Sequence, residues 1–135
     1  MTDENIQGRK ILIVDDQDRN IKILKIFCRN MGHETIEARN GLEAVEAALT
    51  QQPDVILMDI MMPEMDGFAA TEKIKSMEET KYIPVIMVTA LGSREDRLAG
   101  IAKGADDFLT KPIDHEELKL KLKNNLRNKA FHDFL

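Results

Sequence analysis

The sequence places three acidic residues directly after apolar runs. Asp15 and Asp16 follow the run at 11–14, and Asp59 follows the run at 54–58. Hydrophobic packing does not explain why a buried apolar run should end in two adjacent like charges, which repel each other. Carboxylates that lie close together raise each other's pKa or recruit a cation. A sparse cluster of oxygen ligands suits Mg²⁺, which retains several waters and also binds phosphate oxygens.

Two further polar residues occupy similar places. Thr89 ends the apolar run IPVIMVT, and Lys111 follows the run DFLT. A hydroxyl, an ammonium and a metal ion around one carboxylate would form a pocket for a phosphoryl group, with the carboxylate as nucleophile. Each residue alone is weak evidence, because an acid pair at a strand end is commonly a solvated turn or a helix cap. Four such ends in one chain are harder to explain by solvation.

The hydrophobic pattern predicts the elements that must position these residues. Short apolar runs bounded by turn signals predict strands at 10–14, 33–38, 54–58, 83–89 and 107–110, and the polar run 33–38 is expected at an edge. The segments between them have helical spacing, as in Ile21, Leu24, Cys28 and Met31, or in Leu42, Val45 and Leu49. This alternation predicts an α/β fold, a parallel sheet with helices on both faces.

Ligands of such sheets bind beyond the carboxyl ends of the strands. The acids, the hydroxyl and the ammonium are therefore expected to meet on one rim. Two helix starts are also predicted, because Ser93 with Asp96 and Asp114 with Glu117 have the spacing of a capping box.

Length and composition set broad limits. A chain of 135 residues predicts one domain, and no apolar run approaches the roughly 20 residues that span a bilayer. The opening segment is polar and unlike a secretory signal, and the single Cys28 cannot form an internal disulfide. A net charge of -5 argues against direct binding of nucleic acid. We therefore expect a cytoplasmic domain without direct nucleic-acid or membrane contacts.

Four motifs together resemble a known family: VDD at 14–16, MDIMMPEMDG at 58–67, VTA at 88–90 and TKP at 110–112. They resemble the receiver domain of two-component response regulators, from Lys10 to about Lys123. The resemblance implies a doubly wound, flavodoxin-like sheet of five parallel strands in the order 2-1-3-4-5. It divides the chain into a polar tail (1–8), a receiver domain (9–123) and a helical extension (124–135), which could lead to an output domain.

The resemblance also implies roles for the acids. Asp59 would be the phosphoacceptor. Asp15 and Asp16 would hold Mg²⁺ together with Asp59 and the main-chain carbonyl of Met61.

The remaining site residues would act on the phosphoryl group. Lys111 would contact its oxygens, and Pro112 would follow a cis peptide bond that aims the lysine. Thr89 and Phe108 would form a switch pair, in which the hydroxyl moves to the phosphate and the ring turns inward behind it. Phe108 stands where the family often has tyrosine, so packing would be its only signal.

The implied function is a signalling switch that receives a phosphoryl group from a histidine kinase or phosphotransfer protein. It would promote its own phosphorylation and hydrolysis without being an enzyme in the ordinary sense. The last two strands and the last helix would contact an output domain or a second copy. Met61 and Leu91 lie two residues beyond Asp59 and Thr89, and their apolar side chains predict slow hydrolysis because they cannot orient the attacking water.

Three alternatives remain. A phosphatase of the haloacid dehalogenase type also uses Mg²⁺ and an aspartate, but in a DxDxT-like loop after the first strand, where this chain has Asp15, Asp16 and Gln17. A nucleotide-binding domain would need glycine motifs that the sequence lacks. A receiver that binds partners without being phosphorylated would be expected to have lost some of the five chemical positions.

The last predicted helix has two apolar faces. One consists of Leu118, Leu122 and Leu126, and the other of Leu120, Phe131, Phe134 and Leu135. The second face cannot pack on the same core. It predicts either a frayed end or a contact with another helix.

Overall fold

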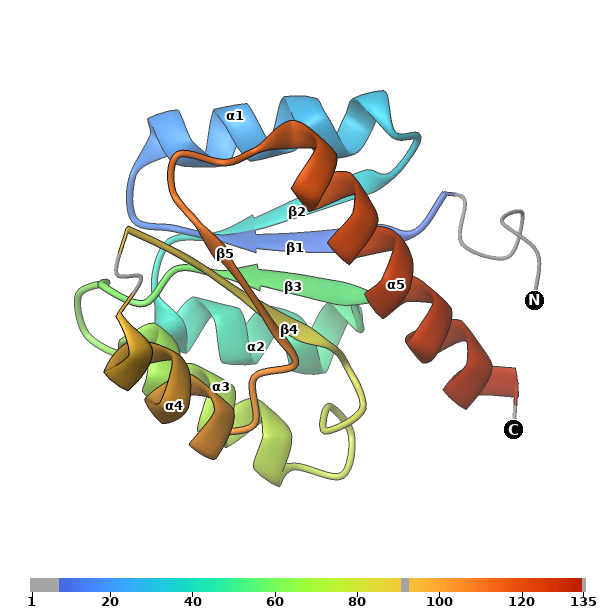
Figure 1. Cartoon of the computed structure of the whole chain (residues 1–135). Helices are drawn as coiled ribbons and strands as arrows, with labels where there is room; N and C mark the ends of the chain where they lie inside the picture. Colours follow the sequence, from blue (N-terminus) through green and yellow to red (C-terminus); the bar gives the residue numbers. More distant parts are fainter. Residues whose placement is uncertain (1–7, 91–92, 135) are drawn as a thin grey trace.

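The computed structural model describes residues 8–90 and 93–134. In this part of the chain, strands and helices alternate (Figure 1): β1 (Lys10–Val14), α1 (Asp18–Asn30), β2 (Glu34–Ala38), α2 (Gly41–Gln51), β3 (Val55–Met58), α3 (Gly67–Ser76), β4 (Val85–Thr89), α4 (Arg94–Ala102), β5 (Asp107–Thr110) and α5 (His115–Phe134). All neighbouring strands are parallel, in the order β2-β1-β3-β4-β5. The predicted doubly wound sheet is confirmed, and each strand lies inside its predicted run.

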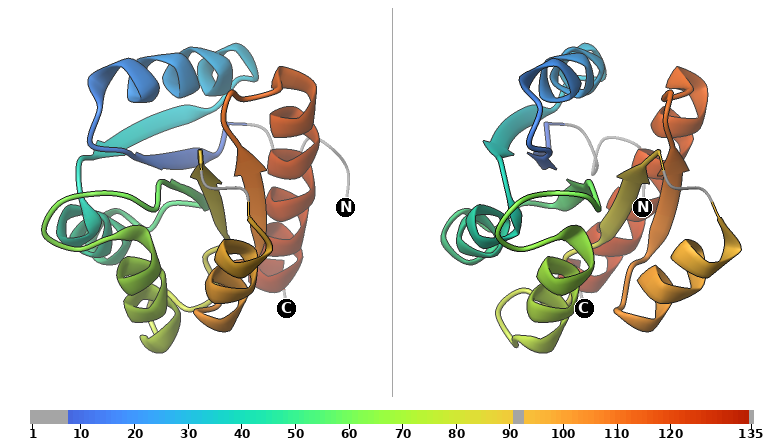
Figure 2. Two further views of the ribbon diagram at one scale, coloured as in Figure 1. Left: turned by 60° about the vertical axis from the view of Figure 1, so that its left-hand side comes forward. Right: turned by 90° about the vertical axis from the view of Figure 1, so that its left-hand side faces the viewer.

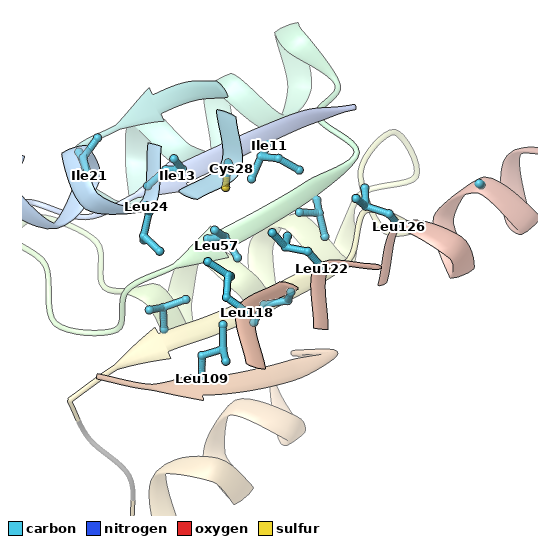
Figure 3. Close-up of a cluster of buried hydrophobic side chains, with 14 residues drawn as sticks. Ile11, Ile13, Ile21, Leu24, Cys28, Leu57, Leu109, Leu118, Leu122 and Leu126 are labelled. Carbon is cyan, nitrogen blue, oxygen red and sulfur yellow. The ribbon is translucent and has the colours of Figure 1, made fainter. Parts of the chain in front are cut away.

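The sheet is buried on both faces because helices cover both (Figure 2). Alternate side chains of β1 enter opposite cores, as the period of two in a strand requires. Ile11 and Ile13 pack with α1 and α5, and this core is drawn in Figure 3. Leu12 and Val14 pack with α2 and α3. The apolar run that precedes the acid pair therefore belongs to two cores at once. The polar β2 lies at an edge of the sheet, as predicted.

The predicted helix caps are present. Ser93 Oγ accepts a hydrogen bond from the main-chain N–H of Asp96 over 3.2 Å. Asp114 Oδ1 accepts hydrogen bonds from the main-chain N–H groups of Glu116 and Glu117 over 2.9 and 3.1 Å. Both contacts satisfy donors that a helix start leaves unpaired.

The helix predicted from the spacing of Leu42, Val45 and Leu49 is confirmed as α2, but two of these three residues lie outside its buried face. Leu42 and Leu49 are 49% and 37% exposed, whereas the buried residues of the helix are Gly41, Ala44, Ala47 and Ala48. The reason is close packing against neighbouring main chain. A Cβ added to Gly41 would lie 2.4 Å from the carbonyl oxygen of Met65. Only small residues fit such a surface, so the leucines turn outward.

The last helix keeps one of its two apolar faces on the core. Leu118, Leu122 and Leu126 are buried as predicted, whereas the exposed residues are Leu120, Phe131 and Phe134; Leu135 lies outside the described residues. The helix stays attached near its end, because Ala130 is buried and the rings of His132 and Tyr82 stack with centroids 3.9 Å apart. Among the described helices, none combines the length and apolar character needed to cross a membrane.

Candidate functional site

The three acids converge at the carboxyl ends of β1 and β3. Asp15 donates its main-chain N–H to the carbonyl of Ala38 over 3.1 Å, and Asp59 donates its own to the carbonyl of Val14 over 2.9 Å. Each acid thus extends the strand ladder and is held in place by main-chain hydrogen bonds. Carboxylate oxygens of Asp15, Asp16 and Asp59 lie within 4.8 Å of one another. Asp15 and Asp59 are buried, whereas Asp16 is exposed.

Lys111 brings a positive charge to the two buried acids. Its Nζ lies 2.9 Å from Asp15 Oδ2 and 3.6 Å from Asp59 Oδ1. Its main-chain N–H donates to the carbonyl of Thr89 over 2.8 Å, so the ends of β4 and β5 are joined at the site. The Lys111–Pro112 peptide bond is cis, as the resemblance implies.

Asp59 has an unusual ionisation. Burial and the nearby charge of Asp15 raise the pKa of Asp59 to about 6, against the opposing effects of Lys111 and of the main-chain N–H of Ile60. That N–H donates to Asp59 Oδ1 over 2.9 Å. The carboxylate is therefore largely ionised at neutral pH. Its ionisation has a free-energy cost, which a nearby cation would reduce.

The acid cluster fits a magnesium ion. The buried carboxylates of Asp15 and Asp59 are a hard, anionic donor set, and the exposed Asp16 leaves room for water ligands. When bound, Mg²⁺ would neutralise charge on the carboxylates and on phosphoryl oxygens. The Met61 carbonyl as a further ligand stays a prediction.

A close contact fixes the loop that follows Asp59. The main-chain N–H of Gly67 donates to the carbonyl of Ile60 over 2.8 Å. A Cβ on Gly67 would lie 2.1 Å from the carbonyl oxygen of Asp59, so only glycine fits there. This role of Gly67 is not among those predicted from the sequence. The signal was its place at the first position of a helix, where a glycine without a turn to make indicates close approach of main chain.

The predicted switch pair lies on the neighbouring strands. Thr89 is buried at the end of β4, and Phe108 is half-buried in β5. The ring of Phe108 packs against α4, because a Cβ on Gly100 would lie 2.5 Å from its Cζ. The ring thus already lies over the core in this structure, and its movement on phosphorylation stays a prediction.

Of the two residues expected to shield the phosphoryl group, the structure describes Met61 but not Leu91. Met61 is 67% exposed, two residues after Asp59. Leu91 lies outside the described residues.

Comparison with known sequences gives a consistent result. Residues 11–123 match the family model described as the response regulator receiver domain. The chain is 41% identical over 126 residues to the response regulator PleD of Caulobacter vibrioides, covering 93% of this chain and 28% of that protein. It is 42% identical over 120 residues to the transcriptional regulatory protein SrrA of Staphylococcus aureus, covering 89% and 48%. The chain spans less than half of these relatives.

Solved structures agree. A putative response regulator from Chloroflexus aurantiacus superimposes with a TM-score of 0.86 at 33% identity, covering 90% of this chain and 99% of the other. The receiver domain of the sensor histidine kinase PA1611 from Pseudomonas aeruginosa, solved with magnesium in its active-site cleft, gives a TM-score of 0.83 at 32% identity, covering 89% and 98%.

Proposed function

This chain belongs to the response regulator receiver domain family, and on that premise we propose that it is a phosphorylation-dependent switch with Asp59 as phosphoacceptor. Members of this family are signalling switches rather than classical enzymes. The observation that carries the proposal is the buried Asp59, whose pKa is raised to about 6 beside Asp15 while Lys111 lies 3.6 Å away. Such an acid is poised to become the nucleophile of a phosphoryl transfer.

In the proposed reaction, a histidine kinase or phosphotransfer protein supplies a phosphohistidine. A carboxylate oxygen of Asp59 forms a bond to phosphorus as the bond from phosphorus to the imidazole nitrogen breaks, and that nitrogen keeps the electron pair. Lys111 would stabilise the charge on the phosphoryl oxygens, and Asp15 and Asp16 would hold Mg²⁺, which would supply further charge neutralisation. The same site would accept small phosphodonors and would later admit the water that hydrolyses the aspartyl phosphate.

A groove beside the site supports a protein donor. It has a volume of about 380 Å³ and lies between α1 and the loop that joins β5 to α5. Its apolar lining includes Leu24, Phe27 and Ile113, and Lys111 also lines it. We propose that an apolar surface of the phosphohistidine-bearing partner binds there, because Lys111, which would contact the phosphoryl group, lines the same groove.

The relay of the signal would pass through Thr89 and Phe108 to β5 and α5. An output domain, or a second copy of the chain, would read the change there. The relatives named above support this proposal, because both are much longer than the region that matches this chain. The cytoplasmic location expected from the sequence likewise stays a prediction.

Phosphorylation with a small donor tests the assignment. Incubation with acetyl phosphate and Mg²⁺ should add one phosphoryl group by intact-mass spectrometry, and Asp59→Asn should abolish the addition. Asp133→Asn, which changes an exposed acid on α5, is the matched control and should be labelled like the native protein. Undiminished labelling of Asp59→Asn would refute the phosphoacceptor, and labelling that survives a chelator would remove the metal from the mechanism. Failure of the native protein to be labelled would favour a receiver that only binds partners.

A further inference from the structure

A small polar cluster joins strand β5 to the buried face of α5. Most of that face is apolar, and Figure 3 shows Leu118, Leu122 and Leu126 directed toward the sheet. Lys121 and Asn125 lie one helical turn apart, so they project from the same side of the helix. Asn125 is only 5% exposed. A polar group buried to this degree is expected to have specific partners.

The partners are at the start of β5. The ammonium of Lys121 lies 3.2 Å from Asp107 Oδ1 and also donates to the main-chain carbonyl of Phe108. Asp107 Oδ1 accepts the main-chain N–H of Phe108 over 2.8 Å. The side-chain amide of Asn125 donates to Asp107 Oδ2 over 3.4 Å and to the carbonyl of Lys121 over 2.8 Å. The cluster of Asp107, Lys121 and Asn125 thus holds both main-chain polar groups of Phe108.

These contacts lie at an edge of the sheet. Among the described strands, only β4 pairs with β5, so one side of β5 has main-chain groups without a described strand partner. At Phe108 those groups are bonded by the side chains of Asp107 and Lys121. The main-chain position of the proposed switch residue is therefore set from α5 as well as from the sheet.

We propose that Lys121 is a positioning residue that couples the movement of Phe108 to α5. The proposal rests on the proposed function, in which Thr89 and Phe108 respond to phosphorylation at Asp59. A shift of the main chain at Phe108 moves the carbonyl that Lys121 holds. Because the same ammonium pairs with Asp107, α5 must follow or both contacts break. Breaking them would leave the Asp107 carboxylate without its cation and the Phe108 carbonyl without this donor in a partly buried place, which is unfavourable. Asn125 extends the constraint by one further helical turn.

NMR of the full chain tests this coupling. Beryllofluoride with Mg²⁺ serves as the probe, because it mimics a phosphoryl group on an aspartate. In the native protein, amide shifts should appear around Asp59, in β5 and in α5 between residues 122 and 130. In Lys121→Met, the shifts around Asp59 and Thr89 should remain, whereas those in α5 should fall to less than half of the native values.

Two further variants make the result specific. Lys119→Met is the matched control, because Lys119 is an exposed lysine on the same helix, and it should respond like the native protein. Lys121→Arg keeps donors for both the carbonyl and the carboxylate and should restore most of the α5 response, which also covers the case in which Lys121→Met folds poorly. A full α5 response in Lys121→Met, an equal loss in Lys119→Met, or no rescue by Lys121→Arg would overturn the coupling. The coupling would also be overturned if the native protein showed no amide shifts in α5. If shifts around Asp59 were seen in that case, the assignment of Asp59 as phosphoacceptor would not be affected.

Discussion

At the scale of single residues, the charge of Asp59 lowers the stability of the folded protein. Its main-chain N–H completes the ladder beyond β3, but its carboxylate is buried beside Asp15. Burial and that neighbour raise its pKa to about 6, because both disfavour the charged form. A folded-state pKa above the ordinary 3.8 means that the folded state binds the proton more tightly than the unfolded state. This acid therefore lowers stability progressively as pH rises from about 4 through about 6.

Removal of the charge should stabilise the protein at high pH alone. In metal-free buffer, Asp59→Asn should raise the free energy of unfolding by about 2 kcal/mol at pH 8 and by much less at pH 4, where the acid is protonated in the folded state and partly protonated in the unfolded state. Urea titrations at the two pH values measure the difference. An equal gain at both would show that charge is not the cause. Glu46→Gln, at an exposed position on α2, should change neither value appreciably.

Met61 should control how long the phosphoryl group survives. Its exposed thioether lies two residues from Asp59 and cannot orient water by hydrogen bonding. We expect Met61→Asn to accelerate loss of the phosphoryl group by roughly tenfold, because an amide can position the attacking water. Met61→Leu is the control and should decay like the native protein. The time course of dephosphorylation after removal of the donor decides, and identical decay of the Asn variant would refute the shielding role.

At the scale of elements, the start of α3 and the end of β3 form a tight main-chain contact. Gly67→Ala would force a Cβ toward the Asp59 carbonyl, 2.1 Å away in the native geometry. We expect a loss of about 1–3 kcal/mol in stability, as is typical of overpacking, together with slower phosphorylation. Lys73→Ala, on the exposed side of α3, should cost little. Urea unfolding and acetyl phosphate labelling measure the two effects, and a neutral Gly67→Ala would contradict the contact.

The two faces of α5 should differ sharply in their contribution to stability. Leu126 is 1% exposed, so Leu126→Ala should cost about 2–5 kcal/mol. Phe134 is 83% exposed, so Phe134→Ser should change the free energy of unfolding by less than about 0.5 kcal/mol. Thermal or urea denaturation compares the two variants. A large loss in Phe134→Ser would show that its ring has a partner within the fold or in a second copy.

At the scale of the whole molecule, the site and the fold are thermodynamically linked. A ligand that binds only the folded state stabilises it, by about 2.7 kcal/mol at a hundred times its Kd. Titration with Mg²⁺ should therefore raise the melting temperature of the native protein. The same titration should have a much smaller effect on Asp59→Asn, which lacks one carboxylate of the proposed site. If Mg²⁺ raised the melting temperatures of the native protein and of Asp59→Asn equally, the ion would bind at a site without Asp59.

Much of this molecule could be predicted from local patterns. The strands β1 and β3 are continuous apolar runs, and the polar groups after them must share a rim because all strands are parallel. The buried face of α2 could not be predicted, because helical spacing fits its alanines as well as its leucines and only the approach of Met65 decides. The raised pKa of Asp59 and the bonds of Lys121 depend on distances between residues far apart in the chain.

The side chains that hold Phe108 also bear on how the protein avoids its own aggregation. An exposed edge strand is a template on which a strand from another molecule can add. In β5, the outward main-chain groups at Phe108 are occupied by Asp107 and Lys121, and these two side chains form an ion pair beside the strand. An incoming strand would have to displace an ion pair before it could form its first hydrogen bonds. At this position, the edge of β5 next to α5 is therefore less accessible to strand addition and aggregation.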